Sequence, residues 1–175
     1  MNLERAPRRV AVVVGNPKPR SRTYGVATTV AGALEETAGK GSERLVVDLA
    51  DHAGQLFDPR DPALSELTAA VAASDIVVVA SPTYKASYTG LLKAFFDRYG
   101  TNGLAGTIAV PVMTGAAPLH TLAVEVHLRP LLVELGAVVP TRGLYVTEDA
   151  LDRLDSVVAA WAATAVPLVR KSLGL

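Results

Sequence analysis

A series of short, valine-rich runs, apolar at successive positions, most constrains what this chain can fold into. Such runs fit strands covered on both faces, because a strand with one face in water alternates apolar and polar residues. Longer segments with helical periodicity separate them. The expected strands are Arg9–Val14, Arg44–Leu49, Asp75–Ala80, Thr107–Met113 and Val138–Val146. The expected helices are Ser21–Thr37, Pro62–Ala73, Ser87–Tyr99, Pro118–Leu135 and Asp149–Leu173.

Strands alternating with helices in this way predict an α/β fold, a doubly wound five-stranded parallel sheet with helices on both faces. A chain of 175 residues fits one such domain. No internal repeat, linker or second-domain boundary is visible, so we expect a single domain over residues 1–175. The polar, proline-containing segment Asp51–Asp61 is expected to be a surface loop.

Charge and cysteine content narrow the classes of partner. The 17 Lys and Arg residues balance 17 Asp and Glu residues, which argues against capture of nucleic acid or of an anionic membrane. The absence of cysteine excludes disulfides, thiolate metal sites and a cysteine nucleophile, and it suits a reducing cytoplasm. The apolar run Val10–Val14 is too short for a signal peptide, and no run approaches the roughly 18 residues of a membrane span. We therefore expect a cytoplasmic protein.

In a doubly wound sheet, ligands bind at the carboxyl ends of the strands, near the point where strand order reverses. The first loop there, "GNPKPRSRT" (Gly15–Thr23), brings Ser21, Arg22 and Thr23 to the start of a helix. Free N–H groups and the positive end of the helix dipole favour a phosphate at that position, and hydroxyl and guanidinium groups add hydrogen bonds. The alternative is an ordinary N-cap at Ser21 beside a solvated Arg22.

This first loop also excludes several nucleotide sites. It lacks the GxxxxGK[ST] pattern of nucleoside-triphosphate hydrolases and the GxGxxG pattern of Rossmann dinucleotide sites. A phosphoacceptor receiver domain needs carboxylates at the ends of the first and third strands. Those ends carry Gly15-Asn16 and Ser81-Pro82 instead.

The loops after the third and fourth strands could complete a ligand site. In "SPTYKASYTG", Pro82–Lys85 lie at the mouth of a buried strand, as turn punctuation or as one wall of a site. In "TGAAPLH" (Thr114–His120), small residues would let a planar ligand approach the backbone; the alternative is a tight turn into a helix that has Pro118 in its first turn. His120 is a candidate ligand contact. His52, expected in a loop, and His127, on a helix face or at a subunit contact, have no metal-ligand spacing relative to it, and no Ser/His/Asp trio stands out.

With these loops in place, nearly the whole chain resembles the NAD(P)H-dependent FMN reductases of the flavodoxin-like superfamily. The most specific stretch has the pattern SPxYxxxxxGxLKxxxD, matched by Ser81, Pro82, Tyr84, Gly90, Leu92, Lys93 and Asp97. The likeness is closest to members that supply reduced FMN to two-component monooxygenases, such as the alkanesulfonate systems. It implies the strand order 2-1-3-4-5, FMN and NADPH or NADH as cofactors, and a possible monooxygenase partner.

The resemblance also implies roles for the matching residues. Ser21, Arg22 and Thr23 would hold the FMN phosphate. Pro82, Thr83, Tyr84 and Lys85 would line the isoalloxazine ring. Thr114, Gly115, Ala116 and Ala117 would present backbone to the pyrimidine or ribityl side; relatives often have a second glycine where this chain has Ala116. Because hydride transfer is carried by the cofactors, no catalytic side chain and no metal ion is expected.

Two other functions fit the same residues. One is a quinone, azo-dye or metal-ion reductase that retains FMN tightly. The other is a flavodoxin-type electron carrier without enzymatic activity. Carriers of that kind tend to be strongly acidic, whereas this chain has no net charge.

The segment Pro118–Leu135 has more apolar surface than one core stripe requires. Leu119, Leu122, Ala123 and Val126 form one face, and Val124, Leu128, Leu131, Leu132 and Leu135 continue around the helix. This breadth predicts burial against a second subunit, in a homodimer or homotetramer, or deep burial within one chain. Pro130 should kink the helix or force a bulge. Some FMN-donating relatives have a π-bulge at a subunit contact that lines up with Glu125–Pro130.

Aromatic residues elsewhere are expected to pack. The stripe of Tyr88, Leu91, Leu92, Phe95, Phe96 and Tyr99 is interpreted as core or dimer interface. In the last helix, Trp161, Val157, Val158, Ala165 and Leu168 are expected to pack against the sheet.

Overall fold

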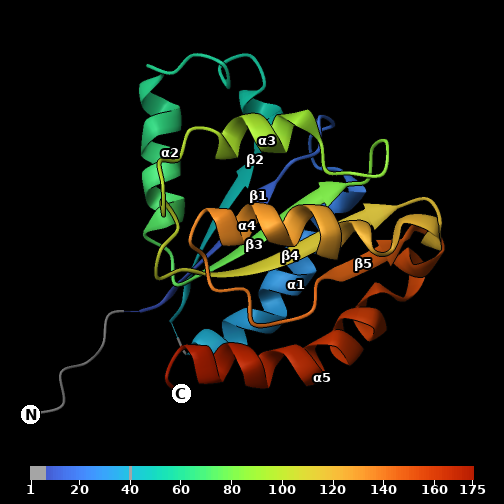
Figure 1. Cartoon of the computed structure of the whole chain (residues 1–175). Coiled ribbons are helices and arrows are strands. Elements are labelled where there is room, and N and C mark those ends of the chain that lie inside the picture. The colour runs from blue at the N-terminus through green and yellow to red at the C-terminus, as the bar shows by residue number, and fades with distance from the viewer. Residues whose placement is uncertain (1–6, 40) are drawn as a thin grey trace, which may run out of the picture.

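The computed structural model describes residues 7–39 and 41–175, and its centre is one parallel five-stranded sheet (Figure 1). The strand order is β2-β1-β3-β4-β5, which confirms the predicted doubly wound, flavodoxin-like architecture. The strands are β1 (Arg9–Val14), β2 (Glu43–Asp48), β3 (Ile76–Pro82), β4 (Ile108–Gly115) and β5 (Leu144–Thr147).

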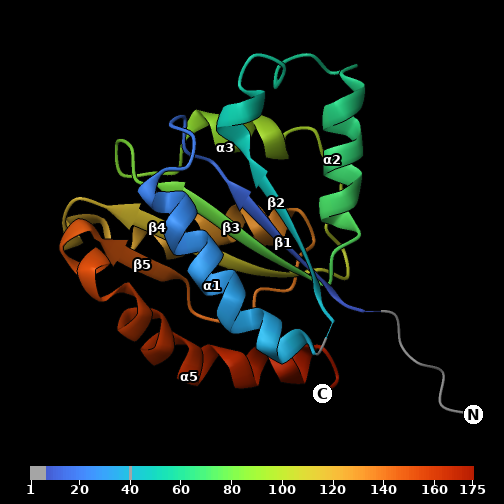
Figure 2. The same ribbon diagram turned by 180° about the vertical axis from the view of Figure 1, so that it is seen from behind.

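Helices cover both faces of the sheet (Figures 1 and 2). Helices α1 and α5 pack on one face, and α2, α3 and α4 pack on the other. The helices are α1 (Arg22–Ala38), α2 (Pro62–Ala72), α3 (Gly90–Phe96), α4 (Arg129–Glu134) and α5 (Leu154–Ser172). The sheet is therefore the middle of three layers.

Strand β1 shows why its sequence is apolar without alternation. Val10, Val12 and Val14 belong to the core beneath α1 and α5. Ala11 and Val13 face the other core, beneath α2, α3 and α4. Successive side chains point to opposite faces of a strand, so a strand between two helical layers needs an apolar residue at every position.

The aromatic residues of the third helical segment pack in the core, which was one of the two predicted roles, the other being a dimer interface. Phe95 and Phe96 are fully buried with ring centroids 5.4 Å apart, and the Tyr99 hydroxyl donates to the Thr68 carbonyl at 3.0 Å. Helix α3 begins at Gly90 instead of Ser87, because the Thr89 hydroxyl caps it by accepting from the Leu92 N–H at 3.1 Å.

The last helical segment differs from its prediction in where the helix begins and in the burial of one residue. A 3-10 turn over Glu148–Arg153 precedes α5, so the regular helix begins later than Asp149. Val158 and Ala165 are buried and Trp161 packs against the same core. Leu168 is exposed, so its expected packing against the sheet is wrong.

The fifth strand is shorter than predicted, and two prolines explain the difference: Pro140 in the expected strand, which cannot continue the donation that Val138 begins, and Pro111 in the neighbouring strand. Val138 donates to the Thr107 carbonyl, and the Ala109 N–H donates to Val138 at 2.9 Å. Two residues further along β4, Pro111 has no N–H to donate on that same side. The chain leaves the sheet over residues 139–143 and pairs again only from Leu144, opposite Val112.

Side chains from the neighbouring helix bind the backbone of this detour. Arg129 donates to the carbonyls of Val139, at 2.8 Å, and of Thr141. The Glu125 carboxylate accepts the Gly143 N–H at 2.6 Å. A Cβ on Gly143 would lie 2.4 Å from a methyl group of Val124, so the close approach requires glycine.

The segment expected to be one helix from Pro118 to Leu135 is interrupted. It contains a 3-10 turn (Pro118–His120), a π-helix (Val124–Leu128) and then α4. The π-helix confirms the bulge expected near Pro130, which lies in the first turn of α4, where its missing N–H costs least. Leu119, Leu122, Val126 and Val133 are exposed, whereas Ala123, expected on the same face, is buried.

Two further observations concern residues 7–39 and 41–175. None of their helices is both long and apolar enough to cross a membrane. No cluster of three or more potential metal-ligating side chains occurs among them.

Candidate functional site

A pocket of about 410 Å³ opens at the carboxyl ends of β1, β3, β4 and β5. Its walls come from the loops that follow these strands, which lie on one edge of the sheet because the strands are parallel. The lining residues are Asn16, Lys18, Arg20, Ser21, Arg22, Thr23, Pro82, Thr83, Tyr84, Thr114, Gly115, Ala116, Val146, Glu148 and Leu151. Nine of the twelve predicted site residues are among them.

A larger hollow, of about 560 Å³, lies at the opposite edge of the sheet. Its polar groups are already paired: the Asp75 carboxylate accepts the Arg9 N–H at 2.9 Å, and the Arg9 side chain bonds Glu43 at 3.2 Å. The smaller pocket differs because it presents polar groups without partners. We therefore identify the smaller pocket as the candidate functional site.

The N-terminus of α1 presents donors to the pocket. The Ser21 hydroxyl caps the helix by accepting from the Tyr24 N–H at 3.3 Å. Within the described residues, the N–H groups of Arg22 and Thr23 have no hydrogen-bond partner. Two unpaired donors at the positive end of a 17-residue helix suit an anion such as a phosphate.

Buried polar side chains tie the first loop to the end of β4. The Asn16 amide donates to the Thr23 hydroxyl at 3.1 Å, and this hydroxyl lies 2.8 Å from that of Thr114. Asn16 also accepts the Lys18 N–H at 2.9 Å. The sequence prediction missed Asn16 as a site residue, although a buried amide directly after a strand was a usable signal.

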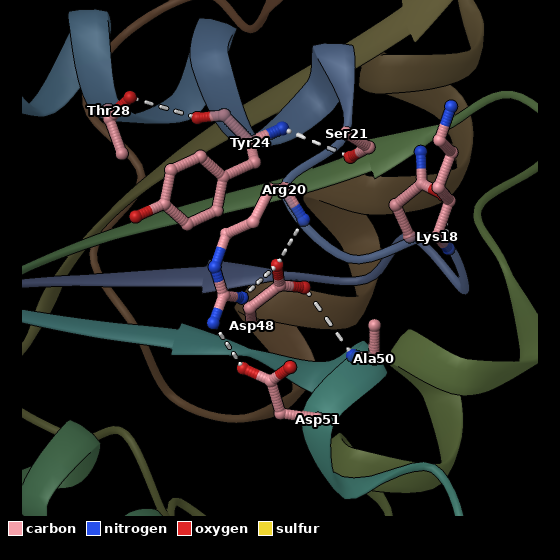
Figure 3. A network of polar contacts seen from close by, with 9 residues as sticks. Lys18, Arg20, Ser21, Tyr24, Thr28, Asp48, Ala50 and Asp51 are labelled. Carbon is pink, nitrogen blue, oxygen red and sulfur yellow. Dashed lines mark hydrogen bonds and ion pairs between the residues drawn. The ribbon is translucent and has the colours of Figure 1, made fainter.

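Arg20 was also missed, and its contacts tie the loop after β1 to Asp48 and Asp51 (Figure 3). Its φ is 50°, a left-handed backbone conformation that is uncommon outside glycine. One oxygen of the buried Asp48 accepts both the Arg20 N–H, at 2.9 Å, and its guanidinium, at 2.7 Å. A second bond, to Asp51 at 2.8 Å, and the Asp48 contacts raise the pKa of Arg20. The end of β2 therefore holds the phosphate-side loop in place.

The loop after β3 forms the second wall. The Thr83 N–H donates to the Thr114 carbonyl at 2.7 Å, and Tyr84 and Ser87 then exchange two hydrogen bonds across a two-residue turn. Tyr84 is 51% exposed at the pocket. Among the described residues, the buried Thr83 hydroxyl has no hydrogen-bond partner, so a ligand group that reached it would satisfy it.

In the loop after β4, Gly115 is small for a reason other than the predicted approach of a ligand. A Cβ on Gly115 would lie 1.9 Å from the Tyr145 hydroxyl oxygen, so glycine is needed there to make room for a tyrosine of β5. Within the described residues, the N–H groups of Ala116 and Ala117 have no acceptor. They are available to a carbonyl edge of a ligand.

Three predicted site residues lie outside the pocket lining: Lys85, Ala117 and His120. Lys85 is at the tip of the two-residue turn with φ 51°, so it is exposed beyond the wall that Tyr84 forms. The Ala117 carbonyl accepts from the Tyr145 hydroxyl at 3.3 Å. His120 is exposed in the 3-10 turn that follows Ala117.

The turn after β5 supplies a fourth wall that the sequence prediction did not include. Val146, Glu148 and Leu151 line the pocket. The Glu148 carboxylate forms an ion pair with the Arg22 guanidinium, with Nη2 and Oε1 2.8 Å apart. The sequence prediction included only the loops after the first, third and fourth strands, so it missed the wall after β5. The pairing of Arg22 with Glu148, far along the chain, leaves no local signal in the sequence.

Together these groups fit FMN. The helix N-terminus and its cations suit the phosphate, and the unpaired N–H groups of Ala116 and Ala117 suit the polar edge of a flat ring. The exposed Tyr84 leaves the pocket open on one side. A ring bound there would remain accessible to a second planar ligand.

Comparison with known proteins gives the family. The model of the NADPH-dependent FMN reductase family matches residues 8–152. An NADH-dependent FMN reductase of Pseudomonas putida, SfnF, is 33% identical over 150 residues, or 83% of this chain and 80% of its own. The FMN reductase (NADPH) of Escherichia coli K12 is 33% identical over 137 residues, or 74% and 68%.

A solved structure supports the same assignment. The apo form of the NADH:FMN oxidoreductase EmoB superposes with a TM-score of 0.76 at 28% identity, covering 90% of this chain and 89% of its own. The family match spans the phosphate-side loop, the β3 wall and the β4 wall. The chain therefore belongs to the NADPH-dependent FMN reductase family and is an NAD(P)H-dependent FMN reductase.

Proposed function

We propose that this enzyme binds FMN in the pocket at the carboxyl ends of the strands and there catalyses its reduction by NADPH or NADH. The observation that carries this assignment is that, within the described residues, unpaired N–H groups of Arg22 and Thr23 line one side of the pocket and that of Ala116 lines the other, with the unpaired N–H of Ala117 next to it in the chain. When bound, FMN supplies the hydride-accepting chemistry. The protein supplies placement and electrostatics.

The phosphate-side residues fix the position of the flavin. The Arg22 and Thr23 N–H groups and the Arg22 guanidinium donate to the phosphate, and the Ser21 cap keeps the helix end in place. The Asp48–Arg20 contacts hold the preceding loop in its left-handed conformation. Phosphate binding therefore orients the ring that lies between the β3 and β4 walls.

The ring-side residues orient the flavin and stabilise charge on it. The Ala116 and Ala117 N–H groups donate to the pyrimidine edge, where negative charge accumulates on reduction. The Thr83 hydroxyl gains the partner that it lacks in the free protein. Tyr84 borders the open side, where the nicotinamide ring stacks on the flavin.

The wider setting is part of the proposal. Named relatives include both NADH-dependent and NADPH-dependent FMN reductases, so either nucleotide is a candidate donor. We propose that FMN exchanges as a substrate and that its reduced form passes to a partner monooxygenase in the cytoplasm. The exposed Leu119, Leu122, Val126 and Val133 form the surface proposed for homodimer or homotetramer contacts.

The test is steady-state oxidation of NADPH and of NADH across an FMN concentration series, with riboflavin as the control flavin. Exchangeable FMN predicts a rate that saturates with added FMN, and the phosphate contacts predict a lower KM for FMN than for riboflavin. Nucleotide oxidation that never depends on added flavin, by a protein purified yellow, contradicts exchange. The absence of any flavin-dependent oxidation contradicts the whole function.

A further inference from the structure

The ion pair between Arg22 and Glu148 crosses the phosphate side of the pocket. Arg22 is the first residue of α1, and Glu148 is the first residue of the 3-10 turn after β5. Their side chains are 2.8 Å apart, and both residues line the pocket. The Glu148 carboxylate is therefore paired with the guanidinium of the residue whose own N–H group at the start of the helix is, like that of Thr23, unpaired among the described residues.

Stabilisation of the fold does not account for this pair. The two side chains are 65% and 47% exposed, and ion pairs with such exposure contribute little to stability. Each residue is held by its own element as well, since Ser21 caps α1 and β5 is hydrogen-bonded to β4. The placement of the pair matters more for what enters the pocket.

Two of the three cations that line the phosphate side, Arg20 and Arg22, are already paired with carboxylates. Arg20 is bonded to Asp48 and Asp51, and Arg22 is paired with Glu148. Lys18 forms no ion pair within the described residues. A phosphate dianion thus enters a site where the Arg22 guanidinium already has an anionic partner at Nη2, and it has to compete with that carboxylate for the position and charge of the side chain.

We infer that Glu148 competes with the FMN phosphate for Arg22 and so sets how tightly FMN is held. The inference rests on the proposed function. Displacing an exposed carboxylate costs little, so FMN still binds. The Arg22–Glu148 pair stabilises the flavin-free state, so it lowers the affinity for FMN and favours the release that a flavin used as a substrate requires. Riboflavin lacks the phosphate, so the competition does not act on it.

The experiment measures dissociation constants for FMN and riboflavin by quenching of flavin fluorescence, and the FMN release rate by stopped flow. Glu148→Gln should bind FMN about three- to fivefold more tightly and release it more slowly, with riboflavin binding unchanged. Asp149→Asn is the matched control, because this exposed neighbour removes the same charge from the same turn without lining the pocket. It should change FMN binding by less than about twofold.

A double variant separates competition from general repulsion. If Glu148 acts through Arg22, then Glu148→Gln should no longer tighten FMN binding when Arg22 is already methionine. Unchanged or weaker FMN binding by Glu148→Gln, equal tightening of riboflavin, or the same effect without Arg22 overturns the inference. Failure of the wild-type protein to bind FMN is a different result, because it overturns the proposed function itself.

Discussion

Two glutamate–arginine pairs in this protein join the same side-chain types and have opposite surroundings. Glu125 and Arg129 are 28% and 26% exposed, and both also bond the backbone of the detour before β5. Glu148 and Arg22 are about twice as exposed and face a pocket. Arg129 is the main cause that lowers the pKa of Glu125. The surroundings of the two pairs lead to different expectations: Glu125–Arg129 should stabilise the fold, whereas Glu148–Arg22 should affect how tightly FMN is held.

The largest expected effect comes from removing the less exposed pair, Glu125–Arg129. Glu125→Ala takes away the acceptor of the Gly143 N–H and leaves Arg129 without its carboxylate. We expect the free energy of unfolding to fall by about 2 kcal/mol, because unpaired groups with little exposure lose more than the bond itself. Urea unfolding measures this change. A loss below about 0.5 kcal/mol would show that the detour does not depend on the pair.

The next effect concerns ligand binding at the more exposed pair, Arg22–Glu148. Arg22→Met removes a charged donor from the phosphate side, so the dissociation constant for FMN should rise about tenfold while that for riboflavin changes little. Arg153→Met is the control, since this exposed arginine lies outside the pocket lining. Equal weakening of both flavins by Arg22→Met would contradict a phosphate contact.

The pH dependence of stability should report on the Glu125–Arg129 pair. Because the pKa of Glu125 is lower in the folded protein than in the unfolded chain, its contribution is present above the ordinary glutamate pKa of about 4.3. It is lost as the pH falls through the lowered value. The stability difference between wild type and Glu125→Gln should therefore be constant from pH 7 to 5 and shrink towards pH 3 in urea titrations. A difference that stays constant to pH 3 contradicts the assignment.

The smallest expected effect is that of the Arg22–Glu148 pair on the free energy of unfolding. Glu148→Gln should change the free energy of unfolding by less than about 0.5 kcal/mol in the absence of flavin, because the pair is exposed. The same urea experiment as for Glu125→Ala measures it. Destabilisation comparable to that of Glu125→Ala would mean that both pairs serve the fold, and the contrast between them would fail.

Much of the fold followed from local sequence, because burial on both faces leaves an unbroken apolar run at β1 and β3. The start of β5 was predicted too early, although Pro140 inside the expected strand was a local signal against it; the second cause, Pro111, lies in the neighbouring strand. The loops after β1, β3 and β4 were predictable as pocket walls from topology alone. Arg20 was not, because its partner Asp48 lies 28 residues away, and neither was Glu148, whose partner is near the other end of the chain.

The detour before β5 has a consequence for the solubility of the folded molecule. Strand β5 is at the edge of the sheet, where unpaired N–H and carbonyl groups can recruit a strand from another molecule. It is four residues long, and the preceding segment is bonded to Arg129 and Glu125 instead of lying flat along the edge. The missing donor of Pro111 thus shortens the edge that could otherwise nucleate aggregation between molecules.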